Sequence, residues 1–238
     1  MLMLLEYSEL AGIFSAEGLE LTEEQYENFR TYARMLVEWN EKMNLTAITD
    51  PRGIGLKHFL DSVIPLKKIE LPQGVSLVDV GTGAGFPGLP MKIYRPDIKL
   101  TLLDSLNKRV NFLSAVCGEI GISAECVHQR AEEGGRRQEF RGKFDFAAAR
   151  AVAAMPVLAE YCLPYVKTGG MFLALKGPSE DYKAGEKAVK ALGGEISEVV
   201  EYSLPDGDKR ILIAVRKISS TPEKYPRNSG QISKKPIM

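Results

Sequence analysis

Hydrophobic residues recur at helical spacing in the first third of the chain. They lie three and four positions apart along one face, at Tyr26, Phe29, Tyr32, Ala33, Leu36 and Val37. The preceding segment Thr22–Gln25 has the form of a capping box, which predicts the start of this helix. A second helix is expected around residues 53–64, before the Pro-Gly boundary at 71–74. The pattern predicts a helical extension over residues 1–72.

The sequence beyond this boundary alternates short apolar runs with amphipathic segments. The apolar runs predict strands at 75–80, 99–103, 123–128, 144–149, 170–176, 195–203 and 210–217. Such alternation is typical of a mostly parallel sheet covered by helices on both faces. Residues 204–208 are too few for a crossover helix, so the last two strands must be antiparallel to each other. We therefore expect an α/β fold with a Rossmann-like, seven-stranded, mostly parallel sheet over residues 73–218.

A glycine-rich loop follows the first predicted strand. Residues Gly83–Gly88 match G-x-G-x-x-G, a pattern that by itself also fits a dinucleotide site or an ordinary glycine turn. Asp79 argues against a dinucleotide, because its carboxylate would repel a pyrophosphate at the helix N-terminus. A cofactor with a sulfonium and an amino-acid end meets no such conflict. We therefore predict S-adenosylmethionine as the cofactor, with Asp79, Gly83 and Gly85 in its site.

Two further acids lie at predicted strand ends. Asp104 follows Gly85 by about the twenty residues expected of an acid that binds ribose hydroxyls. Glu132 comes just after the third strand, where an acid can contact adenine or ribose. Each has a structural alternative, since Asp is a favoured helix cap and an acid near a helix N-terminus is stabilised by the dipole. We predict that both bind the cofactor.

The fourth strand ends at Arg150, followed by Ala151-Val152-Ala153. This tip has neither the Pro-Cys of enzymes that methylate C5 of cytosine nor the Asn/Asp-Pro-Pro-aromatic motif of many amine methyltransferases. A nucleophile with a free lone pair, such as guanine N7, needs no general base, and positioning then supplies most of the catalysis. Arg150 could bind O6, stack on the base or hold the methionine carboxylate, and the alternative is a strand-end salt bridge.

Charge is balanced over the chain but unevenly placed. The 31 basic and 31 acidic residues give a formal net charge of zero, so no overall basic field indicates nucleic acid. Lys108 and Arg109 nevertheless open a helix, where the dipole disfavours cations. The tail at 219–238 is basic and rich in proline. We predict contacts to RNA phosphates, with solvated surface charge as the alternative, for Lys108, Arg109, Lys176, Lys224 and Arg227.

Other features narrow the class of protein. The cysteines have no C-x-x-C spacing and are predicted to be core residues in a reducing compartment: Cys117, Cys126 and Cys162. His58 and His128 are a poor basis for a metal site or a triad, so no metal is expected. His58, near Asp61, is interpreted as a packing residue that could also line the substrate entrance. No signal peptide or membrane-spanning run is evident, which favours a cytoplasmic protein.

Together, these motifs resemble the bacterial 16S ribosomal RNA guanine-N7 methyltransferase G family, also known as glucose-inhibited division protein B. The strand order also resembles class I S-adenosylmethionine-dependent methyltransferases. The matching segments are Trp39-Asn40, Asn44–Thr46, Lys57–Ser62, Asp79–Gly88, Leu103–Arg109, Arg130–Glu132, Arg150–Ala153, Leu175–Gly177 and Tyr225–Arg227. Among these segments, two are specific for this family: the Phe-Pro-Gly extension of the loop and the Asp-Ser-Leu-x-Lys-Arg block.

The resemblance implies methylation of N7 of guanine 527, in the 530 loop of 16S rRNA, within the 30S subunit or an assembly intermediate. It also implies cofactor contacts at Gly81, Phe86, Ala131, Glu132 and Arg150. An unstacked loop base is accessible in the way that proteins usually recognise RNA. Two other classes stay open from the residues alone: a methyltransferase for small molecules or proteins, and a dinucleotide-binding or non-catalytic RNA-binding protein.

Overall fold

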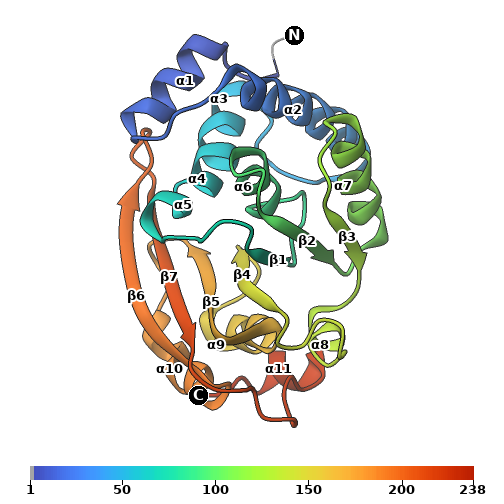
Figure 1. Ribbon diagram of the computed structural model, residues 1–238, viewed down its shortest axis with the longest axis vertical. Coiled ribbons are helices and arrows are strands. Elements are labelled where there is room, and N and C mark those ends of the chain that lie inside the picture. Colours follow the sequence, from blue (N-terminus) through green and yellow to red (C-terminus); the bar gives the residue numbers. More distant parts are fainter. Residues whose placement is uncertain (1–2) are drawn as a thin grey trace.

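The computed structural model describes residues 3–238 and contains one seven-stranded sheet in the order β3-β2-β1-β4-β5-β7-β6 (Figure 1). The strands are β1 (Ser76–Val80), β2 (Lys99–Asp104), β3 (Glu125–His128), β4 (Phe144–Arg150), β5 (Val166–Lys176), β6 (Gly194–Ser203) and β7 (Lys209–Lys217). Strand β7 runs antiparallel to both β5 and β6, and the other pairs are parallel. Every predicted strand is confirmed, although β5 begins at Val166 rather than at residue 170.

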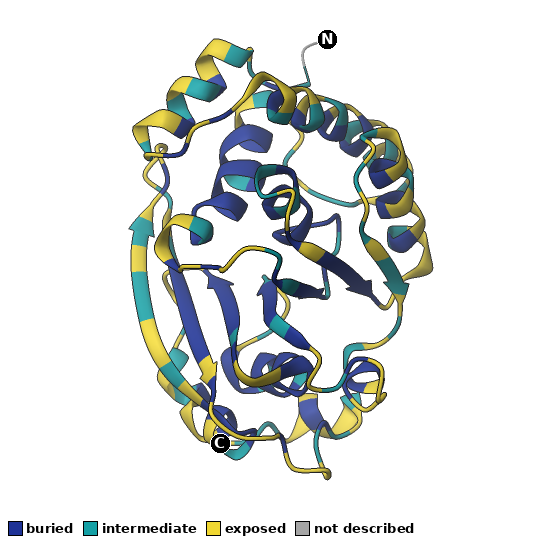
Figure 2. Ribbon diagram, viewed as in Figure 1, coloured by how far each residue is buried: buried dark blue, intermediate teal, exposed yellow. Residues whose placement is uncertain are grey.

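Helices cover both faces of the sheet. They are α1 (Tyr7–Ala16), α2 (Glu23–Met43), α3 (Pro51–Gly53), the π-helix η1 (Ile54–Leu60), α4 (Asp61–Val63), α5 (Pro65–Lys68), α6 (Gly88–Tyr94), α7 (Asn107–Glu119), α8 (Ala131–Gly134), α9 (Met155–Cys162), the 3-10 turns η2 (Leu163–Tyr165) and η3 (Tyr182–Gly185), α10 (Glu186–Ala191) and α11 (Ser229–Lys234). Alternate strand residues enter different cores, because side chains alternate across a sheet. Leu77 packs with the N-terminal helices, α6 and α7, whereas Val78 packs with α9 and α10. Figure 2 shows the central strands as the most buried part of the sheet.

The N-terminal helices differ in one respect from the prediction. The capping box of α2 is confirmed, since Gln25 N donates to Thr22 Oγ1 and Thr22 N donates to Gln25 Oε1. The second predicted helix, around residues 53–64, is divided into α3, η1 and α4. The π-helical hydrogen bonds of η1 add a residue to each turn, which changes the faces on which His58 and Asp61 lie. The spacing of apolar residues in this segment does not indicate a π-helix, so the sequence could not predict it.

The C-terminal tail folds back onto the face of the sheet that α9 and α10 cover. Helix α11 packs against α9, and its residue Ile232 is buried. The Arg227 side chain forms a two-pronged ion pair with Glu160 of α9, whose carboxylate is fully buried. The described tail is therefore a packed part of the molecule and not a solvated extension.

Candidate active site

Asp79, at the end of β1, holds the glycine loop through hydrogen bonds. The Asp79 carboxylate is fully buried at the end of β1, where its Oδ2 accepts hydrogen bonds from Thr82 Oγ1 at 2.7 Å and Gly88 N at 2.8 Å. Among the described residues its Oδ1 has no partner, and burial raises the pKa of Asp79 to about 6. With no exposed surface, Asp79 positions the loop in this structure, and its predicted contact with the cofactor requires the loop to move.

The loop conformation explains its glycines. Gly81, Gly83 and Gly85 have φ angles of 71°, 61° and 104°, a region that residues with a side chain rarely adopt. At Gly85 a Cβ would also clash with the Tyr32 hydroxyl and lie 2.9 Å from a methyl group of Leu113, so both side chains would have to shift. At Gly83 no atom lies within 4 Å of a Cβ position, so this side of the loop faces open space. A ligand can therefore approach the backbone at Gly83.

Asp104 at the end of β2 ties this loop to helix α7. Its Oδ2 accepts from Gly83 N at 2.9 Å and from Arg109 Nη1 at 3.4 Å, and its Oδ1 accepts from Leu106 N at 2.9 Å. Only 2% of Asp104 is exposed. Asp104 is therefore an anchor of the loop in this structure, and its predicted ribose contact requires one of these donors to be displaced.

Glu132, in the first turn of α8, is a buried acid of a different kind. Among the described residues its carboxylate accepts no hydrogen bond from the protein, although only 8% of the residue is exposed. The neighbouring Ala131 is fixed by its carbonyl, which accepts from the Tyr165 hydroxyl at 2.7 Å. The Glu132 oxygens are not among the buried atoms that lack a partner, so the carboxylate faces solvent at the surface of a largely buried residue. A carboxylate in this position is suited to bind donors of a ligand, such as an adenine amine or ribose hydroxyls.

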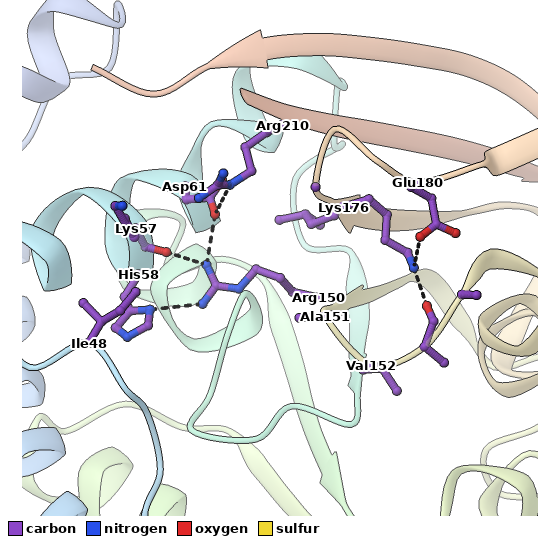
Figure 3. Close-up of a pocket in the computed structure, with 14 residues that line it drawn as sticks. Ile48, Lys57, His58, Asp61, Arg150, Ala151, Val152, Lys176, Glu180 and Arg210 are labelled. Atoms are coloured by element: carbon purple, nitrogen blue, oxygen red, sulfur yellow. Dashed lines mark hydrogen bonds and ion pairs between the residues drawn. The ribbon is translucent and has the colours of Figure 1, made fainter. Parts of the chain in front are cut away.

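Arg150, at the end of β4, is the centre of a group of contacts between the sheet and the N-terminal helices (Figure 3). Its Nη1 donates to the Lys57 carbonyl at 2.9 Å and lies 3.4 Å from Asp61 Oδ2, and its Nη2 lies 3.5 Å from His58 Nδ1. The guanidinium carbon is 4.8 Å from the ring centroid of Phe86 in the glycine loop. The strand-end salt bridge therefore exists, and it holds Arg150 against the loop.

His58 is neutral in this arrangement. Burial and the nearby charge of Arg150 lower the pKa of His58 to about 3. An arginine only donates, so Nδ1 of His58 accepts and Nε2 carries the hydrogen, which it donates to Thr46 Oγ1 at 2.8 Å. The ring also stacks on Phe86 at 4.4 Å. His58 is thus a packing residue, as interpreted from the sequence, and it orients Arg150.

Asp61 brings in two residues for which the sequence contains no signal. Its carboxylate is almost fully buried and accepts from the Tyr202 hydroxyl at 3.0 Å and from Arg210 Nε at 3.2 Å, in addition to Arg150. Tyr202 and Arg210 belong to β6 and β7, more than a hundred residues away in the chain. Because Asp61 is so far from Tyr202 and Arg210 in the sequence, its position could not be used to predict that they bind it.

A cavity of about 610 Å³ opens beside Arg150, between η1 and the ends of β4 and β5. It lies within the range of roughly 300–1,000 Å³ that small-molecule sites occupy. Val152 lines the cavity and also lies against the glycine loop, since a Cβ on Gly81 would lie 3.1 Å from this side chain. Lys176 lines the cavity but donates to the Ala153 carbonyl and to Glu180 Oε2. Lys176 is therefore buried and paired, which contradicts the predicted contact with RNA phosphate.

The other cations predicted to bind RNA divide into two groups. Lys108, near the start of α7, and Lys224, in the tail, are exposed. Arg109 is half-buried and contacts Asp104, whereas Arg227 is held by Glu160 and the Lys235 carbonyl. Arg227 therefore anchors the tail, and its predicted RNA contact requires the pair with Glu160 to break.

Two kinds of feature are absent from residues 3–238. No cluster of three or more metal-ligating side chains is present in this part of the chain. No helix within it combines the length and the apolar character needed to cross a bilayer.

A family model described as rRNA small subunit methyltransferase G matches residues 25–211. The chain belongs to this family. Proteins called ribosomal RNA small subunit methyltransferase G from Clostridium beijerinckii and Clostridium botulinum (strain Eklund 17B / Type B) are 54% and 50% identical over 224 residues, which is 92% of this chain and 94% of theirs. The protein of that name from Desulforamulus reducens is 48% identical over 222 residues, 92% of each chain.

Solved structures support the fold. A SAM-dependent methyltransferase from Aquifex aeolicus aligns with a TM-score of 0.55 and 18% identity, over 74% of this chain and 97% of that one. Precorrin-6y C5,15-methyltransferase from Geobacter metallireducens aligns with a TM-score of 0.51 and 13% identity, over 71% of this chain and 90% of that one. The class I methyltransferase fold expected for this rRNA methyltransferase G family member is confirmed.

Proposed function

We propose that this enzyme transfers the methyl group of S-adenosylmethionine to N7 of guanine 527, in the 530 loop of 16S rRNA. The observation that carries the proposal is the position of Arg150. On one side its guanidinium packs on Phe86 of the glycine loop, and on the other it lines the cavity at the β4 tip. This arrangement supports a cofactor site and a site for a base on two sides of one fixed residue.

The residues around the loop fit the cofactor. Gly83 offers backbone without a side chain in the way, and Glu132 offers a carboxylate that accepts from no protein donor among the described residues. Gly81, Phe86 and Ala131 complete the set that would hold it. When bound, S-adenosylmethionine supplies a methyl group activated by a positively charged sulfur.

His58 and Asp61, which line the cavity beside Arg150, suit a nucleophile that has no proton to lose. His58 stays neutral and its Nδ1 is directed at Arg150, while Asp61 already accepts hydrogen bonds from three side chains. Guanine N7 carries its lone pair in the ring plane and needs no base. The chain then contributes position and exclusion of water, with Arg150 fixed so that it can donate to O6.

An rRNA substrate also implies which residues contact phosphate and in which particle the target guanine is methylated. We infer that Lys108 and Lys224 contact phosphates, because their ammonium groups are exposed and form no ion pair among the described residues. We also infer that the substrate is the 30S subunit or an assembly intermediate in the cytoplasm. A small-molecule or protein substrate would leave the exposed cations without a role.

The test is methyl transfer by the purified protein. Small subunits from cells that lack the gene are incubated with S-adenosylmethionine, and N7-methylguanosine is located by reduction and aniline cleavage of the rRNA strand. We expect one new cleavage, at guanine 527, and none with Arg150→Ala. Methylation only at another atom or another nucleotide would refute the proposal.

A further inference from the structure

The cavity beside Arg150 contains a second acid, Glu180, that the proposed chemistry does not use. Its Oε1 accepts from Met155 N at 2.7 Å and its Oε2 accepts from Lys176 Nζ at 3.0 Å. The side chain is 15% exposed and lines the cavity. A carboxylate has about four acceptor positions, so roughly two remain for a ligand. In Figure 3 this carboxylate lies across the cavity from the His58 and Arg150 cluster.

Glu180 is held in a way that favours recognition of a ligand. Lys176 at the end of β5 is 6% exposed at its side chain and fixes one oxygen, while the first amide of α9 fixes the other. The ammonium of Lys176 offsets the cost of burying the negative charge. Glu180 itself lies in the turn after β5, but its carboxylate is held by groups of β5 and α9. This pre-positioning reduces the entropy lost on binding.

The hydrogen-bonding groups of guanine match this acid. The Watson–Crick edge of guanine carries two adjacent donors, N1–H and the N2 amine, whereas the same edge of adenine has an acceptor at N1 and no N2 amine. A carboxylate can accept from both guanine donors at once. N7 lies on the far side of the purine ring from this edge. A guanine held at Glu180 would thus direct N7 toward the opposite side of the cavity.

We propose that Glu180 is the residue that selects guanine, by accepting hydrogen bonds from N1–H and the N2 amine of the target base. Arg150 lies on the side toward which N7 then points, and Ile48, Val152 and Leu175 supply apolar surface for the faces of the base. Lys176 acts through Glu180 as a positioning residue. This inference rests on the proposed function, because it takes guanine N7 as the methyl acceptor.

The experiment combines a protein substitution with a base substitution. Wild-type protein and Glu180→Gln are assayed on small subunits reconstituted with guanosine or inosine at position 527, since inosine keeps N7 but lacks the N2 amine. We expect inosine to lower kcat/KM of the wild type by about tenfold to a hundredfold, the effect of losing a hydrogen bond to a charged group. Glu180→Gln should lose a similar factor on guanosine. With Glu180→Gln, the change from guanosine to inosine should lower kcat/KM by less than about threefold further. The carboxylate that accepts from the N2 amine is already replaced in this variant.

The outcomes separate the two proposals. An equal inosine penalty in both proteins would overturn the role of Glu180, because mere structural damage adds to the base substitution without interacting with it. A wild type that methylates inosine as well as guanosine would overturn it even if Glu180→Gln fails to fold. A wild type that leaves N7 of guanosine unmethylated would instead refute the proposed function. Glu186→Gln, an exposed acid at the start of α10, is the matched control and should behave as wild type.

Discussion

At the scale of single residues, the buried acids of the site differ in how many hydrogen bonds they already accept. Asp61 and Asp104 each accept from three protein donors, whereas Glu132 accepts from none among the described residues and Glu180 keeps part of its capacity. The sequence predicts that Asp104 and Glu132 lie at strand ends. The sequence does not distinguish an acid that anchors the loop from an acid that binds the cofactor. The difference depends on whether hydrogen-bond donors from distant parts of the chain already occupy the carboxylate.

Glu132→Gln should weaken binding of S-adenosylmethionine. A charge-assisted hydrogen bond becomes a neutral one, so we expect a loss of about 1–2 kcal/mol, or roughly tenfold in Kd. Isothermal titration calorimetry measures the change, and Glu133→Gln, the exposed neighbour, serves as the control. Unchanged affinity in Glu132→Gln would remove this residue from the cofactor site.

His58 predicts how folding depends on pH. The folded protein holds the pKa of His58 at about 3, whereas the unfolded chain takes up a proton near 6.5. The contribution of His58 to folding is therefore complete above pH 6.5 and is lost as the pH falls toward 3. Relative to His58→Gln, the wild type should lose about 1 kcal/mol more per pH unit below about pH 6. Denaturant unfolding at several pH values tests this, and parallel pH profiles would contradict it.

At the scale of elements, the π-helix η1 and Asp61, the first residue of α4 directly after it, connect the N-terminal helices to the far edge of the sheet. Lys57 forms ion pairs with Asp206 and Asp208 in the turn between β6 and β7, and Asp61 binds Tyr202 and Arg210. These contacts hold in place the segment that binds the Arg150 guanidinium through the Lys57 carbonyl and Asp61. Helical spacing predicts that a helix lies here, but the extra residue per turn has no sequence signature.

Asp61→Asn should destabilise the protein strongly. Arg150 and Arg210 would keep their charges at a site where Asp61 is almost fully buried, and breaking such a pair costs about 3–5 kcal/mol. Denaturant titration gives the free energy of unfolding. Glu38→Gln, which removes an exposed pair with Arg34 on α2, should cost less than about 1 kcal/mol. Similar losses in both variants would argue against the connecting role of η1.

At the scale of the whole molecule, the sequence predicts the sheet, the antiparallel hairpin and the glycine loop, because local spacing determines each of them. It does not predict where the tail lies. The pair between Arg227 and Glu160 joins residues 67 positions apart, and neither lies in a pattern that indicates the other. For the same reason, Arg227 and Lys176 resemble RNA-binding cations in the sequence but are paired inside the fold.

Arg227→Gln and Lys108→Gln should therefore have different effects. Loss of Arg227 leaves the buried Glu160 unpaired, so the free energy of unfolding should fall by about 3–5 kcal/mol. Loss of Lys108 should leave stability within about 0.5 kcal/mol and reduce the salt dependence of rRNA binding by about one unit of slope. Binding titrations at several salt concentrations and denaturant unfolding separate the two effects. A reduced salt slope in folded Arg227→Gln would return that residue to the RNA interface.

The most direct measurement of the central claim is a map of N7-methylguanosine in the 16S rRNA of the source cells. We predict methylation at guanine 527 in cells with the gene, its absence in cells without the gene, and its return on expression of the wild-type chain but not of Arg150→Ala. Methylation of guanine 527 that persists without the gene would contradict the account.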